Sequence, residues 1–151
     1  MTQSERLFCS LRQLWVAATP EECVRQALVY DLIHHLGYPA AHLAIEVHLS
    51  QLPHLKFSQL LPKRRADLVV FGRGNPSNHE LIPLLLVECK AVSLSSKTMR
   101  QVWGYNYFVQ APLIAAVNQT TIRLEWQDPT THVLHSSNAL PPYAYLISHY
   151  L

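Results

Sequence analysis

The stretch Leu84-Leu85-Leu86-Val87-Glu88-Cys89-Lys90-Ala91 decides the fold of this chain. It begins with four consecutive apolar residues, as expected of a central strand covered on both faces, and becomes polar only near its end. Because side chains alternate along a strand, we expect Glu88 and Lys90 on one face and Cys89 on the other. The sequence therefore predicts a buried strand that carries a carboxylate and an amine side by side at its carboxyl end.

Other segments predict the rest of a sheet around this strand. The run 66–71 is apolar and β-branched and is followed by the turn-rich stretch 72–78, so it predicts a neighbouring strand. Further segments with strand character lie at 43–47, at 113–118 and in a hairpin formed by 122–126 and 131–134. Together these segments predict a mixed central sheet.

A first helix is predicted to precede the strands. It begins with Thr19 as N-cap, Pro20 at its first position and Glu22 as the closing residue of a capping box, and it ends at Gly37. Its apolar stripe for the core consists of Val24, Leu28, Leu32 and Leu36. We expect Arg25 to lie off this stripe.

The order of the elements predicts the fold class. A second helix is predicted at about 97–110, where serines precede it and Pro112 stops it, and a further helix is expected around 7–17. The order helix, three strands, helix, strand predicts a single α/β domain over residues 1–151, with a mixed central sheet flanked by helices.

Composition excludes several classes of protein. Of the 151 residues, 49% are hydrophobic and only 15% are charged, which excludes a disordered chain. The three cysteines form no C-x-x-C pair, so we expect a reducing, cytoplasmic setting without disulfides. The longest apolar run, 83–87, is too short to cross a bilayer, so no membrane attachment is expected. The net charge of +2 is small, so contacts with DNA must rest on local clusters.

The end of the central strand also carries the residues that point to a reaction. Asp67 lies at the start of the neighbouring strand, so its carboxylate is expected to meet that of Glu88 at one edge of the sheet. Two carboxylates suit Mg²⁺, with Mn²⁺ as a substitute, and the backbone carbonyl of Cys89 is a further candidate ligand. Phosphodiester hydrolysis needs such a cation and a positive group such as Lys90 near the developing charge. A surface salt bridge is the simpler interpretation of an isolated E-x-K motif.

Four motifs in order add a family resemblance. They are TPEECVRQ at 19–26, RADLVVF at 65–71, LLVECKA at 85–91 and QVWGYN at 101–106. With them, the chain resembles the PD-(D/E)xK nuclease superfamily and, more narrowly, the N-terminal nuclease domain of type I restriction enzyme R subunits. The resemblance spans roughly residues 19–118. It implies a restriction-endonuclease-like fold with an αβββαβ core, Mg²⁺ dependence and DNA cleavage.

The resemblance assigns roles to residues of the strands and of the first helix. It implies that Asp67 and Glu88 bind the metal ion and that Lys90 is the catalytic lysine. Glu22 matches an acidic residue of the family's first helix that can join the metal site, and the capping box is the alternative role for it.

Residues outside the strands are candidates for contacts with the substrate. Gln101 and Tyr105 match the Q-x-x-x-Y motif of these nucleases, and four positions apart they share one helix face, from which they can contact a phosphate or the active-site water. The edge of an amphipathic helix is the alternative. Lys63, Arg64 and Arg65 precede Asp67 and are candidates for a phosphate clamp, with a solvated turn as the alternative.

These expectations lead to a Mg²⁺-dependent endonuclease that acts on DNA. The 151 residues hold no Walker-type phosphate loop, so we expect the ATP-driven motor of R subunits to be absent and the domain to act on its own. A homodimer is expected because one site cuts one strand of a duplex. Two alternatives stay open: a non-catalytic domain of the same fold that binds nucleic acid or protein, and an accessory subunit with a helicase-like partner.

Overall fold

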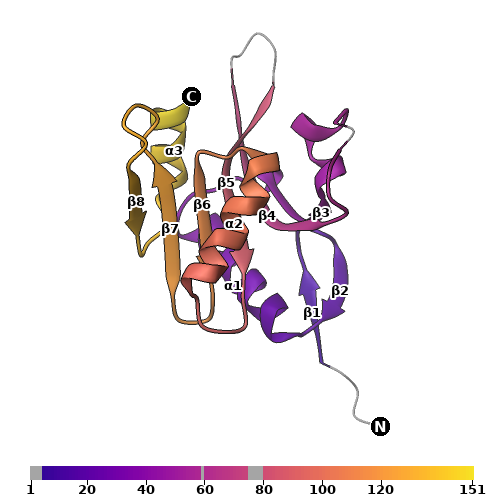
Figure 1. Cartoon of the computed structure of the whole chain (residues 1–151). Helices are drawn as coiled ribbons and strands as arrows, with labels where there is room; N and C mark the ends of the chain where they lie inside the picture. The colour runs from indigo at the N-terminus through magenta and orange to yellow at the C-terminus, as the bar shows by residue number, and fades with distance from the viewer. Residues whose placement is uncertain (1–4, 59, 75–79) are drawn as a thin grey trace.

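The computed structural model describes residues 5–58, 60–74 and 80–151 (Figure 1). Within these ranges the strands are β1 (Arg6–Cys9), β2 (Leu14–Ala17), β3 (Leu43–His48), β4 (Arg65–Arg73), β5 (Leu81–Cys89), β6 (Leu113–Val117), β7 (Ile122–Gln127) and β8 (Leu134–Ser137). The α-helices are α1 (Pro20–His34), α2 (Ser96–Val109) and α3 (Tyr143–Tyr150). Short 3₁₀ turns at Ala40–His42, Leu49–Gln51 and Pro53–Leu55 lie between α1 and β4.

The central sheet has the order β3-β4-β5-β6-β7-β8. β5 and β6 run parallel, and all other neighbours in this sheet are antiparallel. A parallel pair needs a crossover connection, which α2 supplies between the end of β5 and the start of β6. Figure 1 shows α2 in front of the central strands and α1 behind them. The predicted α/β fold with a mixed sheet flanked by helices is therefore confirmed.

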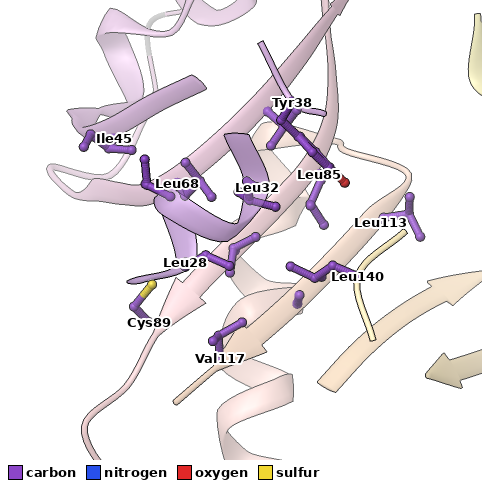
Figure 2. Close-up of a cluster of buried hydrophobic side chains, with 14 of the residues drawn as sticks. Leu28, Leu32, Tyr38, Ile45, Leu68, Leu85, Cys89, Leu113, Val117 and Leu140 are labelled. Carbon is purple, nitrogen blue, oxygen red and sulfur yellow. The ribbon is translucent and has the colours of Figure 1, made fainter. Parts of the chain in front are cut away.

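The hydrophobic core lies on both faces of the central strands. On the α1 face, Leu28 and Leu32 belong to one cluster with Leu68 and Leu85 (Figure 2). On the α2 face, Val102 belongs to a second cluster of buried residues. The apolar stripe predicted for α1 therefore faces the sheet, and the middle parts of the central strands are apolar because helices cover both of their faces there.

The N-terminal segment departs from the prediction. The helix expected around 7–17 is wrong, because this segment forms the antiparallel hairpin β1–β2, in which Phe8 lies opposite Trp15. Aromatic and β-branched residues of this kind favour strands. Gln13, in the turn of the hairpin, has a φ of 54°, a left-handed conformation that does not occur within a helix. Cys9 is buried in the α1-side cluster and attaches the hairpin to α1.

The strand predicted at 43–47 forms, as β3, but its side chains stop alternating regularly at Glu46. Glu46 adopts a left-handed conformation, with a φ of 51°, inside β3. Ile45 packs in the α1-side cluster, whereas Val47, expected on the same face, packs against the α2-side cluster. A residue with positive φ interrupts the two-residue period of a strand, and a glutamate stays in this conformation only where its surroundings hold it there.

The C-terminal part adds a two-stranded hairpin and a helix beyond the predicted αβββαβ core. The predicted hairpin forms from β7 and β8, but β8 starts later because the Asp128 carboxylate accepts the N–H groups of Thr130 and Thr131 and lengthens the turn. Leu146 of α3 is fully buried in the α1-side cluster. Residues 75–78 of the predicted turn at 72–78 lie outside the described residues. In the described ranges, the helices are all too short or too polar to cross a bilayer.

Leu32→Ala tests the packing of α1 on the sheet. Leu32 is 0% exposed, so the truncation should lower the free energy of unfolding by about 2–5 kcal/mol, as measured by urea denaturation followed by circular dichroism. Leu60→Ala is the matched control, because Leu60 is 91% exposed and the same truncation should change that free energy by less than about 0.5 kcal/mol. Equal effects of the two variants would contradict the packing described above.

Candidate active site

Three carboxylates, Glu46, Asp67 and Glu88, lie at one level of three adjacent strands, and we refer to them as the carboxylate row. In the β3–β4 pair, the residue pairs on either side set Glu46 level with Asp67. In the β4–β5 pair, the last residue pair is Leu68 with Val87, and the same register continued by one residue sets Asp67 level with Glu88. Because neighbouring strands are about 4.8 Å apart, this register gathers three acids within a short distance. The placement of Asp67 and Glu88 agrees with their positions in the sequence, whereas Glu46 is an addition.

Asp67 is held from two sides. Its Oδ2 accepts the backbone N–H of Cys89 at 2.7 Å, and its Oδ1 accepts a hydrogen bond from Nη2 of Arg25 at 2.9 Å. A carboxylate has about four lone-pair sites, so these two bonds fix the orientation of Asp67 and leave both oxygens able to take a further partner. The side chain is therefore oriented and still competent to bind a cation.

A buried arginine connects the acids to one another. Arg25 is only 5% exposed; it donates through Nη2 to Asp67 at 2.9 Å and through Nη1 to Glu22, and its Nη2 also forms an ion pair with Glu46 at 2.9 Å. Glu22 in turn pairs with Arg12, which lies in the turn between β1 and β2. Arg25 does lie off the apolar stripe of α1, but it is buried all the same, because three carboxylates compensate the charge of its guanidinium.

Glu22 does not close the predicted capping box, because two arginines bind its carboxylate. Thr19 does cap α1, because its hydroxyl accepts the N–H of Glu22 at 3.2 Å. The carboxylate of Glu22, however, binds Arg12 and Arg25, and the N–H of Thr19 donates to the carbonyl of Ala17. The predicted capping box therefore forms by half only, and the connection of Glu22 to the carboxylate row runs through Arg25.

Glu88 and Lys90 lie together at the end of β5, where Lys90 Nζ is 3.9 Å from Glu88 Oε1. Burial and the charge of Asp67 raise the pKa of Glu88 to about 7, and the charge of Lys90 opposes this shift. Cys89 points into the α1-side cluster (Figure 2), and burial raises the pKa of its thiol, which therefore stays protonated. Only the backbone carbonyl of Cys89 is left as a candidate ligand.

Tyr105 and Arg64 form the outer part of the site. The guanidinium carbon of Arg64 lies 4.7 Å from the centre of the Tyr105 ring, which is a cation–π contact. Burial and the charge of Glu88 raise the pKa of Tyr105, so its hydroxyl lies within the field of the carboxylates and remains a hydrogen-bond donor. Gln101, one turn earlier on α2, is exposed. The two residues of the Q-x-x-x-Y motif thus lie on one helix, and of these two it is Tyr105 whose hydroxyl interacts with the charge of Glu88.

The predicted basic cluster divides into two parts. Arg64 and Arg65 are attached to the site, because Arg64 stacks on Tyr105 and Arg65 Nη1 lies 3.9 Å from Oε2 of Glu46. Lys63 is exposed beside them. The cluster therefore lies next to the carboxylate row, and its contacts with phosphate stay a prediction.

The donor set suits a hard divalent cation. In the part of the chain that the structure describes, no group of three or more His, Cys, Asp and Glu side chains is arranged to hold a metal ion. Mg²⁺ does not need such a group, because it commonly takes one or two carboxylates and completes its shell with water and substrate oxygens. Burial, followed by the charge of Asp67, raises the pKa of Glu88, and a cation held between the two carboxylates would favour their charged forms. Asp67 and Glu88 therefore fit Mg²⁺ or Mn²⁺.

Three residues of this site were not assigned to it from the sequence. Glu46 gave a weak signal, as the one acidic residue of an otherwise apolar strand segment. Arg25 lies within the TPEECVRQ motif one turn after Glu22, a spacing that permits an ion pair on one helix face. Arg12 gave no signal, because the segment around it was interpreted as a helix.

Comparison with known families agrees with this geometry. Residues 20–141 match the family model described as the type I restriction enzyme R protein N terminus. No curated protein and no solved structure matches the chain. The matched range contains the whole carboxylate row, Lys90 and α2. The chain therefore belongs to the family of type I restriction enzyme R protein N termini.

Proposed function

We propose that this domain is a Mg²⁺-dependent endonuclease that hydrolyses phosphodiester bonds of DNA. The observation that carries the proposal is the arrangement at the end of β5, where Asp67 and Glu88 lie level on adjacent strands and Lys90 Nζ is 3.9 Å from Glu88. Membership of a restriction enzyme family supports it. Two oxygen donors and one amine at the same edge of a sheet are the groups that this reaction requires.

Each group at the end of β5 has a role in this proposal. Asp67, Glu88 and the backbone carbonyl of Cys89 are the residues that would hold Mg²⁺, or Mn²⁺ in its place. The bound cation supplies a Lewis acid that polarises the phosphate and acidifies a water molecule. Lys90 places a positive charge where negative charge develops on the phosphate, which stabilises the transition state more than the ground state.

Residues of α2 and of the loop before β4 orient the DNA. The Tyr105 hydroxyl is kept protonated by its raised pKa and donates to a phosphate oxygen, and Gln101 adds an amide on the same helix. Arg64 is oriented by its contact with Tyr105, and Lys63 and Arg65 extend the positive surface beside it. Contacts of this kind fix the register of the backbone and carry no base specificity.

The proposal extends to partners. One site cuts one strand, so cleavage of a duplex calls for two copies, and we propose a homodimer on DNA as the acting form. A helicase-like protein is a second candidate partner, because the resembled R subunits join their nuclease domain to an ATP-driven motor.

Lys90→Ala tests the catalytic role. The variant should cut plasmid and single-stranded DNA at least about 10²-fold more slowly in Mg²⁺ or Mn²⁺, because it loses the charge that stabilises the transition state. Gel assays measure the rate, and Lys56→Ala, a change of an exposed lysine before β4, should keep the wild-type rate. Equal rates for wild type and Lys90→Ala would contradict the role. A wild type that binds DNA without cutting it would identify the non-catalytic alternative.

Glu88→Gln tests the environment of the row. The folded pKa of about 7 lies above the ordinary value of 4.5, so the folded protein binds more protons than the unfolded chain between these pH values. The contribution of Glu88 to stability is therefore complete below pH of about 4.5 and is lost as the pH rises through about 7. In the wild type, the free energy of unfolding should therefore fall by up to about 3 kcal/mol between these pH values because of Glu88. Glu88→Gln cannot titrate, so this part of the fall should be absent, as measured by urea denaturation in EDTA. An unchanged pH dependence would contradict the shift.

Lys63→Ala tests the phosphate contact. Loss of one contact should weaken DNA binding equally across sequences and reduce the slope of log K against log salt concentration by about 1. Fluorescence anisotropy of a labelled duplex in EDTA measures both quantities, with Lys56→Ala as the control. A slope equal to that of the wild type would remove Lys63 from the interface.

A further inference from the structure

Among the described residues, Arg25 is the one that contacts acids from three different elements. Its Nη2 donates to Oδ1 of Asp67 in β4 and forms an ion pair with Oε1 of Glu46 in β3, and its Nη1 donates to Glu22 in α1. We propose that Arg25 is a positioning residue, whose guanidinium sets the orientation of the Asp67 carboxylate for the divalent cation. This inference rests on the proposed cation site of Asp67 and Glu88.

The shape of the guanidinium explains why an arginine is required. The group is a rigid planar fork, so contacts in two directions fix its rotation, whereas an ammonium is a compact charge on a flexible chain. Glu22 anchors the fork on the helix side, and Arg12 holds the other oxygen of Glu22 from the turn of the β1–β2 hairpin. Asp67 is therefore oriented by a group that is itself held in place by α1 and the hairpin.

Two unfavourable features meet at Arg25 and indicate a function beyond stability. Its Nε is buried and has no hydrogen-bond partner among the described residues, which destabilises the folded state. Glu46, which shares Nη2 with Asp67, is held in the left-handed region, and strained backbone of this kind is concentrated at functional sites. Apolar residues in place of a buried ion-pair group are often as stable or more stable, so packing alone does not require this arrangement.

Two effects of Arg25 on cation binding have opposite signs. As a nearby positive charge, Arg25 repels a divalent cation, so its removal should tighten binding if charge were its only effect. As an outer partner of a ligand, it orients Asp67, and removal of such partners typically weakens metal binding roughly 10- to 100-fold. The sign of the change in affinity therefore separates positioning from simple electrostatics.

The test measures binding of Mn²⁺ alone by isothermal titration calorimetry, so it does not depend on cleavage. Arg25→Lys keeps the charge and loses the fork, and the double variant Glu22→Gln/Arg25→Gln removes one charge of each sign. Both should bind Mn²⁺ roughly 10- to 100-fold more weakly than the wild type. Arg123→Lys is the matched control, because Arg123 also pairs with a buried carboxylate: its Nε donates at 2.9 Å to Glu125 of β7. The affinity of this variant for Mn²⁺ should stay within about twofold of the wild type.

The outcomes separate this inference from the proposed function. If both Arg25 variants bind Mn²⁺ as tightly as the wild type, or more tightly, Arg25 does not position Asp67. If neither variant folds, as judged by thermal melting in EDTA, the role of Arg25 is structural and the inference fails. A wild type that binds no Mn²⁺ removes the cation site and this inference with it. If the wild type binds Mn²⁺ and the Arg25 variants bind it more weakly, but the wild type cuts no DNA, the inference stands and the proposed nuclease activity is refuted.

Discussion

The antiparallel pairing of β4 with β5 sets the position of the acids in this protein. It places Asp67 level with Glu88, and the pairing of β3 with β4 adds Glu46 to the same row. A slip of one residue would turn the side chains of a strand to the opposite face, so burial of the strands between α1 and α2 fixes the register. The hydrophobic core therefore determines where the polar site lies. At the end of this strand pair, the side chain of Asp67 accepts the N–H of Cys89 and so links β4 to β5.

The charges of the site are balanced on one side and unbalanced on the other. Toward α1, the guanidinium of Arg25 compensates Glu46 and Asp67, and Glu22 is shared between Arg25 and Arg12. Toward β5, Lys90 Nζ lies 3.9 Å from Glu88, and burial together with the charge of Asp67 raises the pKa of Glu88 to about 7. Because an internal cation already occupies the α1 side, the β5 side is where a divalent ion would relieve the remaining negative charge.

Part of the site comes from outside the range that matches the family. Residues 20–141 contain the carboxylate row and α2, whereas Arg12 and the β1–β2 hairpin precede this range. The hairpin is attached to α1 by the buried Cys9 and by the ion pair between Arg12 and Glu22. The hairpin, which lies outside the matched range, thus contacts the first helix of the family's domain. Through Glu22 and Arg25 it is connected to Asp67.

The sequence by itself determined the elements whose signals are local. The apolar run before Glu88, the cap at Thr19 and the stop at Pro112 report burial and backbone preference within a few residues, so the sheet, its two helices and the meeting of Asp67 with Glu88 were predictable. Only the tertiary structure decided that Arg25 is buried and that Glu46 takes a φ of 51°. These features depend on ion pairs between residues far apart in the chain, which no local period encodes.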